Sequence, residues 1–415
     1  MIERPWRMVA LVCVTATASY LCRVNVSVTG ALLMRELNLT QIQMGRVFSA
    51  FLLGYAAMQI PAGMLADRWG ARRVLTIAVW WWIGATLLQA LIGWGPFATS
   101  AAAALPVLLA LRFVLGVGEA PTFPAAAQGI ARWVPVDQRG RANGVLLGAI
   151  GLGSAIAPPL LSTVMVRWGW RTALIVSALP ALAVGLVWAR VGEPDTIRPS
   201  PDKQKAVEPG GTGVRPWSLA FLTASYTLQG YVGYIFVFWF YLYLVQVRHF
   251  DLLRGALLSS MPWILSIVSI PLGGWISDRL VVGPAGRTWG RRAVPIAGLT
   301  GSGLFISIGA RTADPYMAAV ALALATALVL AVEGPFWATM TEVAGPRSGA
   351  AGGIMNMGSN IGGLISPALT PILAAQIGWE NALHVAAALS ILGALLWLGI
   401  TVDRTLGAGR VAIAP

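Results

Sequence analysis

The stretch Gly63-Met-Leu-Ala-Asp67-Arg68-Trp-Gly70-Ala-Arg72-Arg73 lies between two long apolar runs, and a similar stretch occurs a second time in the chain. Gly274-Trp-Ile-Ser-Asp278-Arg279 repeats its first part, and Gly290-Arg291-Arg292 repeats its second part after an insertion. The two Asp-Arg pairs are 211 positions apart. Self-similarity at a fixed spacing indicates that one structural unit has been duplicated.

A second pair of segments repeats at nearly the same spacing. Gly151-Leu-Gly153-Ser-Ala-Ile-Ala-Pro158 corresponds to Asn360-Ile-Gly362-Gly363-Leu-Ile-Ser-Pro367, an offset of 209 positions. Between the two copies lies a polar stretch that contains Pro and Gly. We therefore expect an N-terminal unit over residues 1–190, a linker over 191–215 and a C-terminal unit over 216–415.

The composition indicates that lipid, not water, solvates most of the chain. Hydrophobic residues make up 57% of the 415 residues and charged residues 11%, and the mean hydropathy is +0.72. A soluble chain of this length needs far more polar surface. The apolar runs predict an all-α membrane protein with six spanning helices in each unit. The predicted spans are residues 8–33, 43–66, 74–94, 99–132, 140–165, 171–190, 216–246, 252–277, 293–310, 314–340, 348–374 and 380–402.

The net charge of +13 reflects topology and does not predict a nucleic-acid partner. With these spans, most of the basic loop residues fall on the side of the N-terminus, and this bias places both termini in the cytoplasm. The sequence contains no recognisable phosphate loop, nucleophile triad or metal-ligand cluster. We therefore expect neither an enzyme nor a bound cofactor or metal.

Four ionisable residues lie inside the predicted spans: Arg23, Arg112, Glu119 and Glu333. A charge at this depth is costly unless it faces a partner or a water-filled cavity, so Arg23 is a candidate anion ligand. Arg112 and Glu119 are seven positions apart on one helix face, roughly 10 Å, which is wide for a direct ion pair. Glu119 is the candidate proton carrier, with Arg112 as the fixed charge that governs it. The alternative is a buried ion pair that only fixes the packing of the helix.

The duplicated loop resembles the signature loop of the major facilitator superfamily, whose members contain two parallel six-helix repeats. The resemblance implies a cytoplasmic charge latch that steadies the outward-facing state. The alternative is a basic loop that serves topology alone. The latch residues would be Asp67, Arg68, Arg72, Arg73, Asp278 and Arg279.

Further motifs resemble the anion:cation symporter family within that superfamily. They are Tyr20-x-x-Arg23-Val-Asn25-Val-Ser27, Phe48-x-x-x-x-x-Gly54-Tyr55, Gln59-Ile-Pro61-Ala-Gly63, Arg112-Phe-Val-Leu-Gly116-Val-Gly-Glu119, Trp133-Val-Pro135, Trp239-Phe-Tyr241-Leu and Gly334-Pro-Phe-Trp337-Ala. The resemblance implies that Arg23 binds a substrate carboxylate and that Glu119 couples transport to protons. Tyr20 and Tyr55 would bond to the substrate, and Trp337 and Asn356 would face it from the other half. The alternative for the aromatic residues is ordinary packing.

Two residues depart from the family pattern. Cys22 stands where bacterial proton-coupled members usually have Asp, and a buried thiol is a poor proton carrier. Glu333 stands where an uncharged residue is expected. It could replace the missing acid, or it could pair with Arg23 when no substrate is bound. A third possibility is that coupling is lost and transport follows the membrane potential.

Together these features predict a monomeric importer of a small organic anion, with protons, in the bacterial inner membrane. One rival is a proton-driven drug exporter, which would need an acidic cavity, and both Arg23 and Arg112 oppose it. A second rival is a sensor with a transporter fold. We would expect it to carry an additional signalling segment, which the sequence after the last apolar run does not suggest.

Overall fold

The computed structural model describes residues 4–94, 100–135, 138–191, 216–284, 286–345 and 348–402, and within them the regular elements are helices. The α-helices are α1 (Arg4–Glu36), α2 (Gln41–Trp69), α3 (Ala71–Ala90), α4 (Ala101–Glu119), α5 (Thr122–Trp133), α6 (Arg139–Arg190), α7 (Pro216–Phe238), α8 (Phe240–Gln246), α9 (Leu252–Val282), α10 (Gly286–Arg311), α11 (Pro315–Ala331), α12 (Glu333–Ala344) and α13 (Ser348–Leu396). A 3-10 helix, η4 (Trp397–Gly399), follows α13. The predicted all-α class is confirmed.

The described residues contain nine apolar stretches long enough to cross a membrane, or ten if α7 and α8, which meet at 51°, form one bent span. Two of these stretches, α6 and α13, each consist of two helical arms that could cross the membrane separately. α6 turns back at Gly169 and α13 turns back at Gly378, each at a left-handed φ of 84° that glycine tolerates. Counting both arms of each gives the twelve spans that the sequence predicts.

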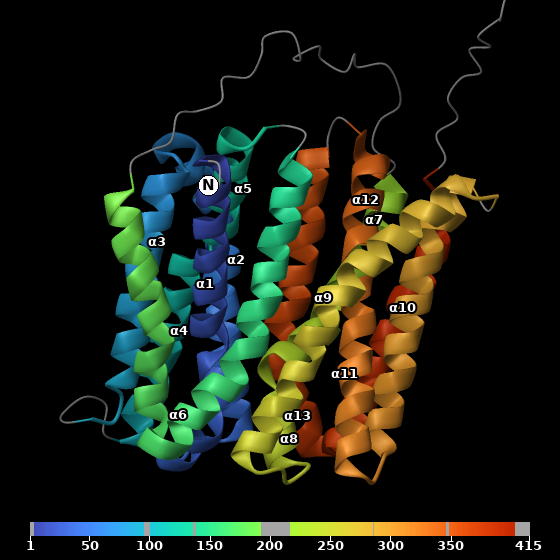
Figure 1. Cartoon of the computed structure of the whole chain (residues 1–415). Coiled ribbons are helices and arrows are strands. Elements are labelled where there is room, and N and C mark those ends of the chain that lie inside the picture. The colour runs from blue at the N-terminus through green and yellow to red at the C-terminus, as the bar shows by residue number, and fades with distance from the viewer. Residues whose placement is uncertain are drawn as a thin grey trace, which may run out of the picture.

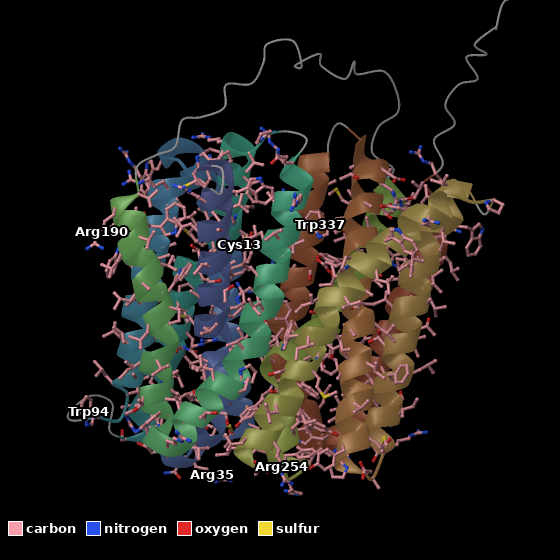
Figure 2. All side chains as sticks on the ribbon, viewed as in Figure 1. Cys13, Arg35, Trp94, Arg190, Arg254 and Trp337 are labelled. Atoms are coloured by element: carbon pink, nitrogen blue, oxygen red, sulfur yellow. The ribbon has the colours of Figure 1, made fainter. Side chains whose placement is uncertain are left out.

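Helices α1–α6 stand on one side of the bundle and α7–α13 on the other (Figure 1). We call the end at which α1 begins the upper face, and the end that carries Arg35 and Arg254 the lower face (Figure 2). The predicted division into two units stays a prediction. Of the predicted linker, residues 192–215 lie outside the described residues.

Equivalent glycines bring equivalent helices into backbone contact in the two halves. A Cβ at Gly153 on α6 would press on the carbonyl oxygen of Thr17 on α1, and one at Gly362 on α13 would overlap that of Thr227 on α7. Small residues let membrane helices approach this closely. The repeat read from the sequence is therefore a repeat of packing as well.

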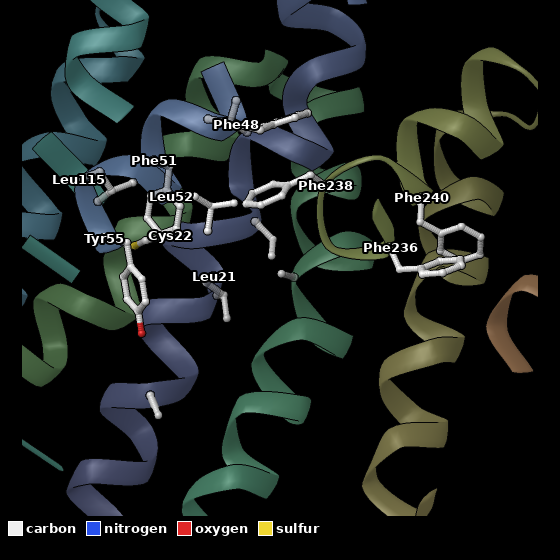
Figure 3. Close-up of a cluster of buried hydrophobic side chains, with 14 of the residues drawn as sticks. Leu21, Cys22, Phe48, Phe51, Leu52, Tyr55, Leu115, Phe236, Phe238 and Phe240 are labelled. Atoms are coloured by element: carbon white, nitrogen blue, oxygen red, sulfur yellow. The ribbon is translucent and has the colours of Figure 1, made fainter. Parts of the chain in front are cut away.

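Hydrogen bonds between the two halves gather toward the lower face. Gln41 Nε2 donates to Gln246 Oε1 at 2.8 Å, and Ser49 Oγ donates to the Leu364 carbonyl at 2.7 Å. Ser162 Oγ donates to the carbonyl of Leu252, the first residue of α9, at 2.8 Å. In the close-up of Figure 3, Phe48 of α2 lies beside Phe238 of α7, and their ring centroids are 5.0 Å apart. The halves are thus joined at the lower face.

Three predicted spans are interrupted by breaks that the apolar pattern does not reveal. One is at Ala120 and Pro121 between α4 and α5, one at Trp239 between α7 and α8, and one at Val332 between α11 and α12. Proline, which cannot donate a backbone hydrogen bond, lies at or just after the first and third breaks. Glu119 and Glu333 both lie at such breaks.

Candidate substrate site

A buried ion pair joins two of the family-like motifs, the one that contains Arg23 and the one that ends at Glu119. Arg23 on α1 is 3% exposed and Glu119 at the end of α4 is fully buried, and Arg23 Nε donates to Glu119 Oε1 at 2.8 Å. The sequence showed no acid near Arg23, because its partner is 96 positions away. A guanidinium at this depth is therefore compensated by a carboxylate from another helix.

Three aromatic rings surround the guanidinium of Arg23. Its central carbon lies 4.6 Å from the ring centroids of both Tyr20 and Tyr55 and 5.2 Å from that of Phe51. Nη1 also donates to the Tyr20 hydroxyl at 3.3 Å. Rings at these distances attract a cation through their π faces and hold the guanidinium in a fixed orientation. The structure therefore brings Tyr20 and Tyr55 to Arg23. Their predicted bonds to the substrate stay a prediction.

Arg112 on α4 is fully buried and contacts both Arg23 and Phe51. Its Nη2 donates to the carbonyl of Arg23 at 3.1 Å, and its guanidinium carbon is 4.8 Å from the Phe51 centroid. Phe51 therefore faces both guanidinium groups. The expectation that Arg112 and Glu119 are too far apart for a direct ion pair agrees with this arrangement, because the carboxylate contacts Arg23 instead.

Several polar atoms of this cluster are buried and have no hydrogen-bond partner among the residues that the structure describes. They are Nη2 of Arg23, Nε and Nη1 of Arg112, and Oε2 of Glu119. Two guanidinium groups face one carboxylate, so the cluster of Arg23, Arg112 and Glu119 carries a surplus positive charge when Glu119 is ionised. Unpaired donors and a surplus cation are the features with which a protein binds an anion.

Within the described residues, the hydrogen-bond donors to Glu333 all come from its own half. Its Oε1 accepts hydrogen bonds from the Tyr226 hydroxyl and, at 3.2 Å, from Trp337 Nε1, and its Oε2 accepts one from Gln229 Nε2 at 3.3 Å. The predicted alternative in which Glu333 pairs with Arg23 is not the arrangement seen, because Arg23 pairs with Glu119. Trp337 is 38% exposed on α12 and lies nearer the upper face (Figure 2). Asn356 is partly exposed on α13.

The two intramembrane acids occupy related positions that the sequence analysis overlooked. Glu119-Ala-Pro121 and Glu333-Gly-Pro335 are the same Glu-x-Pro pattern, and each stands at a helix break, α4 to α5 in one half and α11 to α12 in the other. Comparing the two halves for Glu-x-Pro would have revealed this correspondence.

Three residues of α7 were also missed. Tyr226 and Gln229 contact Glu333, and the ring of Tyr234 stacks on that of Phe238, which in turn contacts Phe48 and Phe51 of the other half. Gln229 carried a usable signal, because it is an amide in the middle of an apolar run. The tyrosines carried none, since aromatic residues are also common packing residues in such runs.

The two copies of the signature loop differ in their contacts. In the C-terminal copy, Arg291 pairs with Asp278 at 2.6 Å and with Glu342 on α12 at 2.6 Å. In the N-terminal copy, Asp67 accepts a hydrogen bond from Gln128 Nε2 at 3.0 Å, and Arg72 Nε has no partner. Arg68, Arg73 and Arg279 are exposed at the same face. Arg291, which joins two acids, was not among the predicted latch residues although the repeat contains it.

The geometry defines a class: a helical membrane protein of two repeated halves, with a buried charged cluster in the N-terminal half. The described residues contain no group of three or more metal-ligating side chains. The model of the Major Facilitator Superfamily matches residues 12–284 and 279–411. The chain belongs to this superfamily, and is thus a membrane transporter and not an enzyme.

Relatives of known assignment refine this placement. A probable sulfoacetate transporter of Cupriavidus necator is 32% identical and aligns over 95% of this chain and 93% of its own length. A D-galactonate transporter of Escherichia coli is 29% identical over 97% of this chain and 96% of its own. These relatives match the anion:cation symporter family that the motifs resemble.

Solved structures share the fold at low sequence identity. A bacterial homologue of the human lysosomal transporter Spinster, in an inward-facing and unoccupied conformation, superposes with a TM-score of 0.79 at 17% identity and covers 96% of this chain and 97% of that one. The D-xylose-proton symporter superposes with a TM-score of 0.77 at 15% identity, over 95% and 98% of the two chains.

Proposed function

We propose that the chain is a secondary active transporter that imports a small organic anion, a sugar acid or another carboxylate, by proton symport. The observation that carries this proposal is the buried cluster of Arg23, Arg112 and Glu119, in which both guanidinium groups keep unpartnered nitrogens. A substrate carboxylate supplies the missing acceptors and the missing negative charge. The relatives named for sulfoacetate and D-galactonate transport support this class of substrate.

Competition for Arg23 gives the coupling a physical basis. The carboxylate of Glu119 and that of the substrate are both acceptors for the same guanidinium. Protonation of Glu119 removes its negative charge and frees Arg23 for the substrate, while Arg112 keeps the site positive. Loss of the proton on the cytoplasmic side restores the pair between Arg23 and Glu119 and displaces the substrate. Tyr20 and Tyr55 hold the substrate beside Arg23 in this scheme.

The C-terminal half completes the proposed site. Trp337 and Asn356 face the substrate from α12 and α13, and Glu333 serves as a second proton-carrying carboxyl. Its three donors, all from one half, leave it independent of Arg23. This role offsets the acid that is missing at position 22.

A second candidate is a uniporter or exchanger of organic anions driven by the membrane potential. Cys22 favours it, because the thiol is fully buried and donates weakly to the Ser177 carbonyl at 3.5 Å, where proton-coupled relatives would have an acid. A buried thiol in such a setting does not carry protons readily.

In an alternating-access cycle, the contacts between the halves at the lower face would close the site on that side. If the basic upper face is cytoplasmic, with both termini, a chain whose halves are joined at the lower face is inward-facing. The units over 1–190 and 216–415 would then rock as two bodies. The charge latch would close in the outward-facing state. Its residues are Asp67, Arg68, Arg72, Arg73, Asp278 and Arg279. The transporter works as a monomer in a bacterial inner membrane in this proposal.

Uptake into proteoliposomes tests the proposal. The wild-type protein should take up one class among sugar acids, sulfoacetate and dicarboxylates, faster when the outside is acidic. Arg23→Ala should weaken substrate binding by at least about 30-fold, because removing one member of a buried charge pair costs roughly 2–5 kcal/mol. Arg254→Ala, which removes an exposed arginine at the lower face, is the matched control.

Other outcomes separate the alternatives. Uptake that follows an imposed potential but ignores a pH gradient would support the uniporter. Transport of amphipathic cations alone would overturn the anion site. Unchanged affinity in Arg23→Ala would do the same, provided that its thermal unfolding shows a folded protein.

A further inference from the structure

A cavity of about 330 Å³ opens at the upper face of the N-terminal half, away from the candidate substrate site. Its walls come from the end of α2, the first turns of α3 and the end of α6. The lining residues are Trp69, Arg72, Arg73, Thr76, Ile77, Trp188 and Ala189. The volume is about ten times the roughly 30 Å³ that one water occupies, so it admits a group the size of a phosphate with its substituents.

The charge in this cavity is not compensated by the protein. Nε of Arg72 is buried without a hydrogen-bond partner, and Arg73 is exposed. Within the described part of the chain, no ion pair includes either arginine. Asp67, the nearest acid along the sequence, already accepts a hydrogen bond from Gln128.

The position of both arginines adds to this imbalance. They lie in the first turn of α3, which has no acidic residue and whose N-cap, Gly70, offers no side-chain cap. The N-terminus of a helix carries a partial positive charge, so two cations there repel it. A bound anion would relieve this repulsion and also pair with the guanidinium groups.

The other half provides an internal comparison. The counterparts of Arg72 and Arg73 in the repeat are Arg291 and Arg292. Arg291 pairs with Asp278 and Glu342, and Arg292 Nε donates to the Ile400 carbonyl at 2.7 Å. No acid on α5 corresponds to Glu342, since the sequence of α5 is TFPAAAQGIARW. The unsatisfied pair is therefore a property of the N-terminal copy and not of the motif.

The rim of the cavity is apolar and faces outward. Trp69 is 49% exposed and Ile77 is 50% exposed, and both line the same cavity as the arginines. The lining elements α3 and the end of α6 lie at the outer edge of the bundle (Figure 1), and Arg190, which follows the lining residue Ala189, is labelled in Figure 2. Indole rings beside basic residues are typical of the membrane interface, where the head groups of lipids lie.

We propose that this cavity binds the head group of an anionic phospholipid. Arg72 and Arg73 contact the phosphate, and Trp69 and Ile77 pack against the glycerol and the start of the acyl chains. Arginine suits this role because its planar donors match phosphate oxygens. The apolar rim assigns the anion to a lipid in preference to a free phosphate.

Lipid retention and thermal unfolding test the site. The full chain is placed in nanodiscs of phosphatidylcholine, with or without phosphatidylglycerol. Retained phosphatidylglycerol is then counted by native mass spectrometry. We expect phosphatidylglycerol to be retained and to raise the unfolding temperature. Arg72→Gln/Arg73→Gln should lose at least tenfold in retention and most of the temperature shift, and Arg73→Gln alone should lose part of both.

The matched control is Arg279→Gln/Arg287→Gln, which removes the same charge from the same face of the other half. Equal losses in this control would reduce the effect to general surface charge and overturn the site. Inorganic phosphate and glycerol phosphate serve as soluble arms. If either one stabilises the wild-type protein as strongly as phosphatidylglycerol, the occupant is a free phosphate and the lipid assignment is wrong. If the double variant does not fold, the single variant decides the outcome.

Discussion

Glu119 and Glu333 begin the same Glu-x-Pro pattern at corresponding helix breaks, yet only Glu119 is paired with an arginine. Glu333 is bonded instead by a tyrosine, a tryptophan and a glutamine. The repeat has therefore placed an acid at the same point of each half and given it different neighbours. Under the proposed function, this asymmetry assigns substrate competition to Glu119 alone.

Glu119→Gln should separate exchange from accumulation. The amide can still accept a hydrogen bond from Arg23 Nε but cannot release a proton, so the loaded carrier still reorients while net uptake loses its driving force. Counterflow in proteoliposomes should persist, and accumulation against a gradient should fall to background. Glu36→Gln removes a partly exposed acid that pairs with Arg171 and serves as control. Continued accumulation by Glu119→Gln would remove this residue from the coupling mechanism.

Glu333→Gln should lower the number of protons moved per substrate by one. The amide keeps an oxygen for the Tyr226 and Trp337 donors, so substrate affinity should change by less than about threefold (under 1 kcal/mol). The measurement is the pH gradient at which net flux stops against a fixed substrate gradient. An unchanged balance point would assign Glu333 a role in packing only.

Gly116→Ala should destabilise the N-terminal half. A Cβ at Gly116 on α4 would overlap the Phe51 carbonyl on α2, and the backbone must move to admit it. Overpacking of this kind costs about 1–3 kcal/mol, which is visible as a lower unfolding temperature in detergent. Gly84→Ala on α3 is the control, because a Cβ there meets no atom within 4 Å. Equal unfolding temperatures for the two variants would contradict the close contact of α2 and α4.

Cross-linking at the lower face should trap the transporter. Gln41 and Gln246 are bonded at 2.8 Å across the two halves, and both native cysteines are buried. Gln41→Cys/Gln246→Cys, joined by a short reducible thiol cross-linker, should stop uptake, and reduction should restore it. Each single variant with the same reagent is the control. Full transport by the cross-linked protein would show that the lower-face contacts need not open.

The architecture could be predicted because the length of the hydrophobic runs and the internal repeat can both be read directly from the sequence. The spans, the two copies of the signature loop and the grouping of Arg23 with Tyr20 and Tyr55 could all be predicted. The pairing of Arg23 with Glu119 could not be deduced from spacing, since it depends on how α1 packs against α4. The same holds for the helix breaks, which are short interruptions within continuous apolar runs.

The two copies of the loop illustrate the other limit. Their sequences are similar, yet within the described residues Arg291 pairs with two acids and Nε of Arg72 has no hydrogen-bond partner. The difference arises on another helix, where α12 carries Glu342 and α5 carries no acid. A motif specifies its own residues, whereas its partners come from the surrounding fold.

Gly169 and Gly378 have a mechanical consequence. Each joins two long arms of a single helical element through one left-handed residue. A connection of one residue is too short to let the two arms shift along each other. We therefore expect each pair of arms to move together as one helical hairpin. The breaks beside Glu119, Trp239 and Glu333 are then points at which a half can bend, and two of them lie beside the acids of the site.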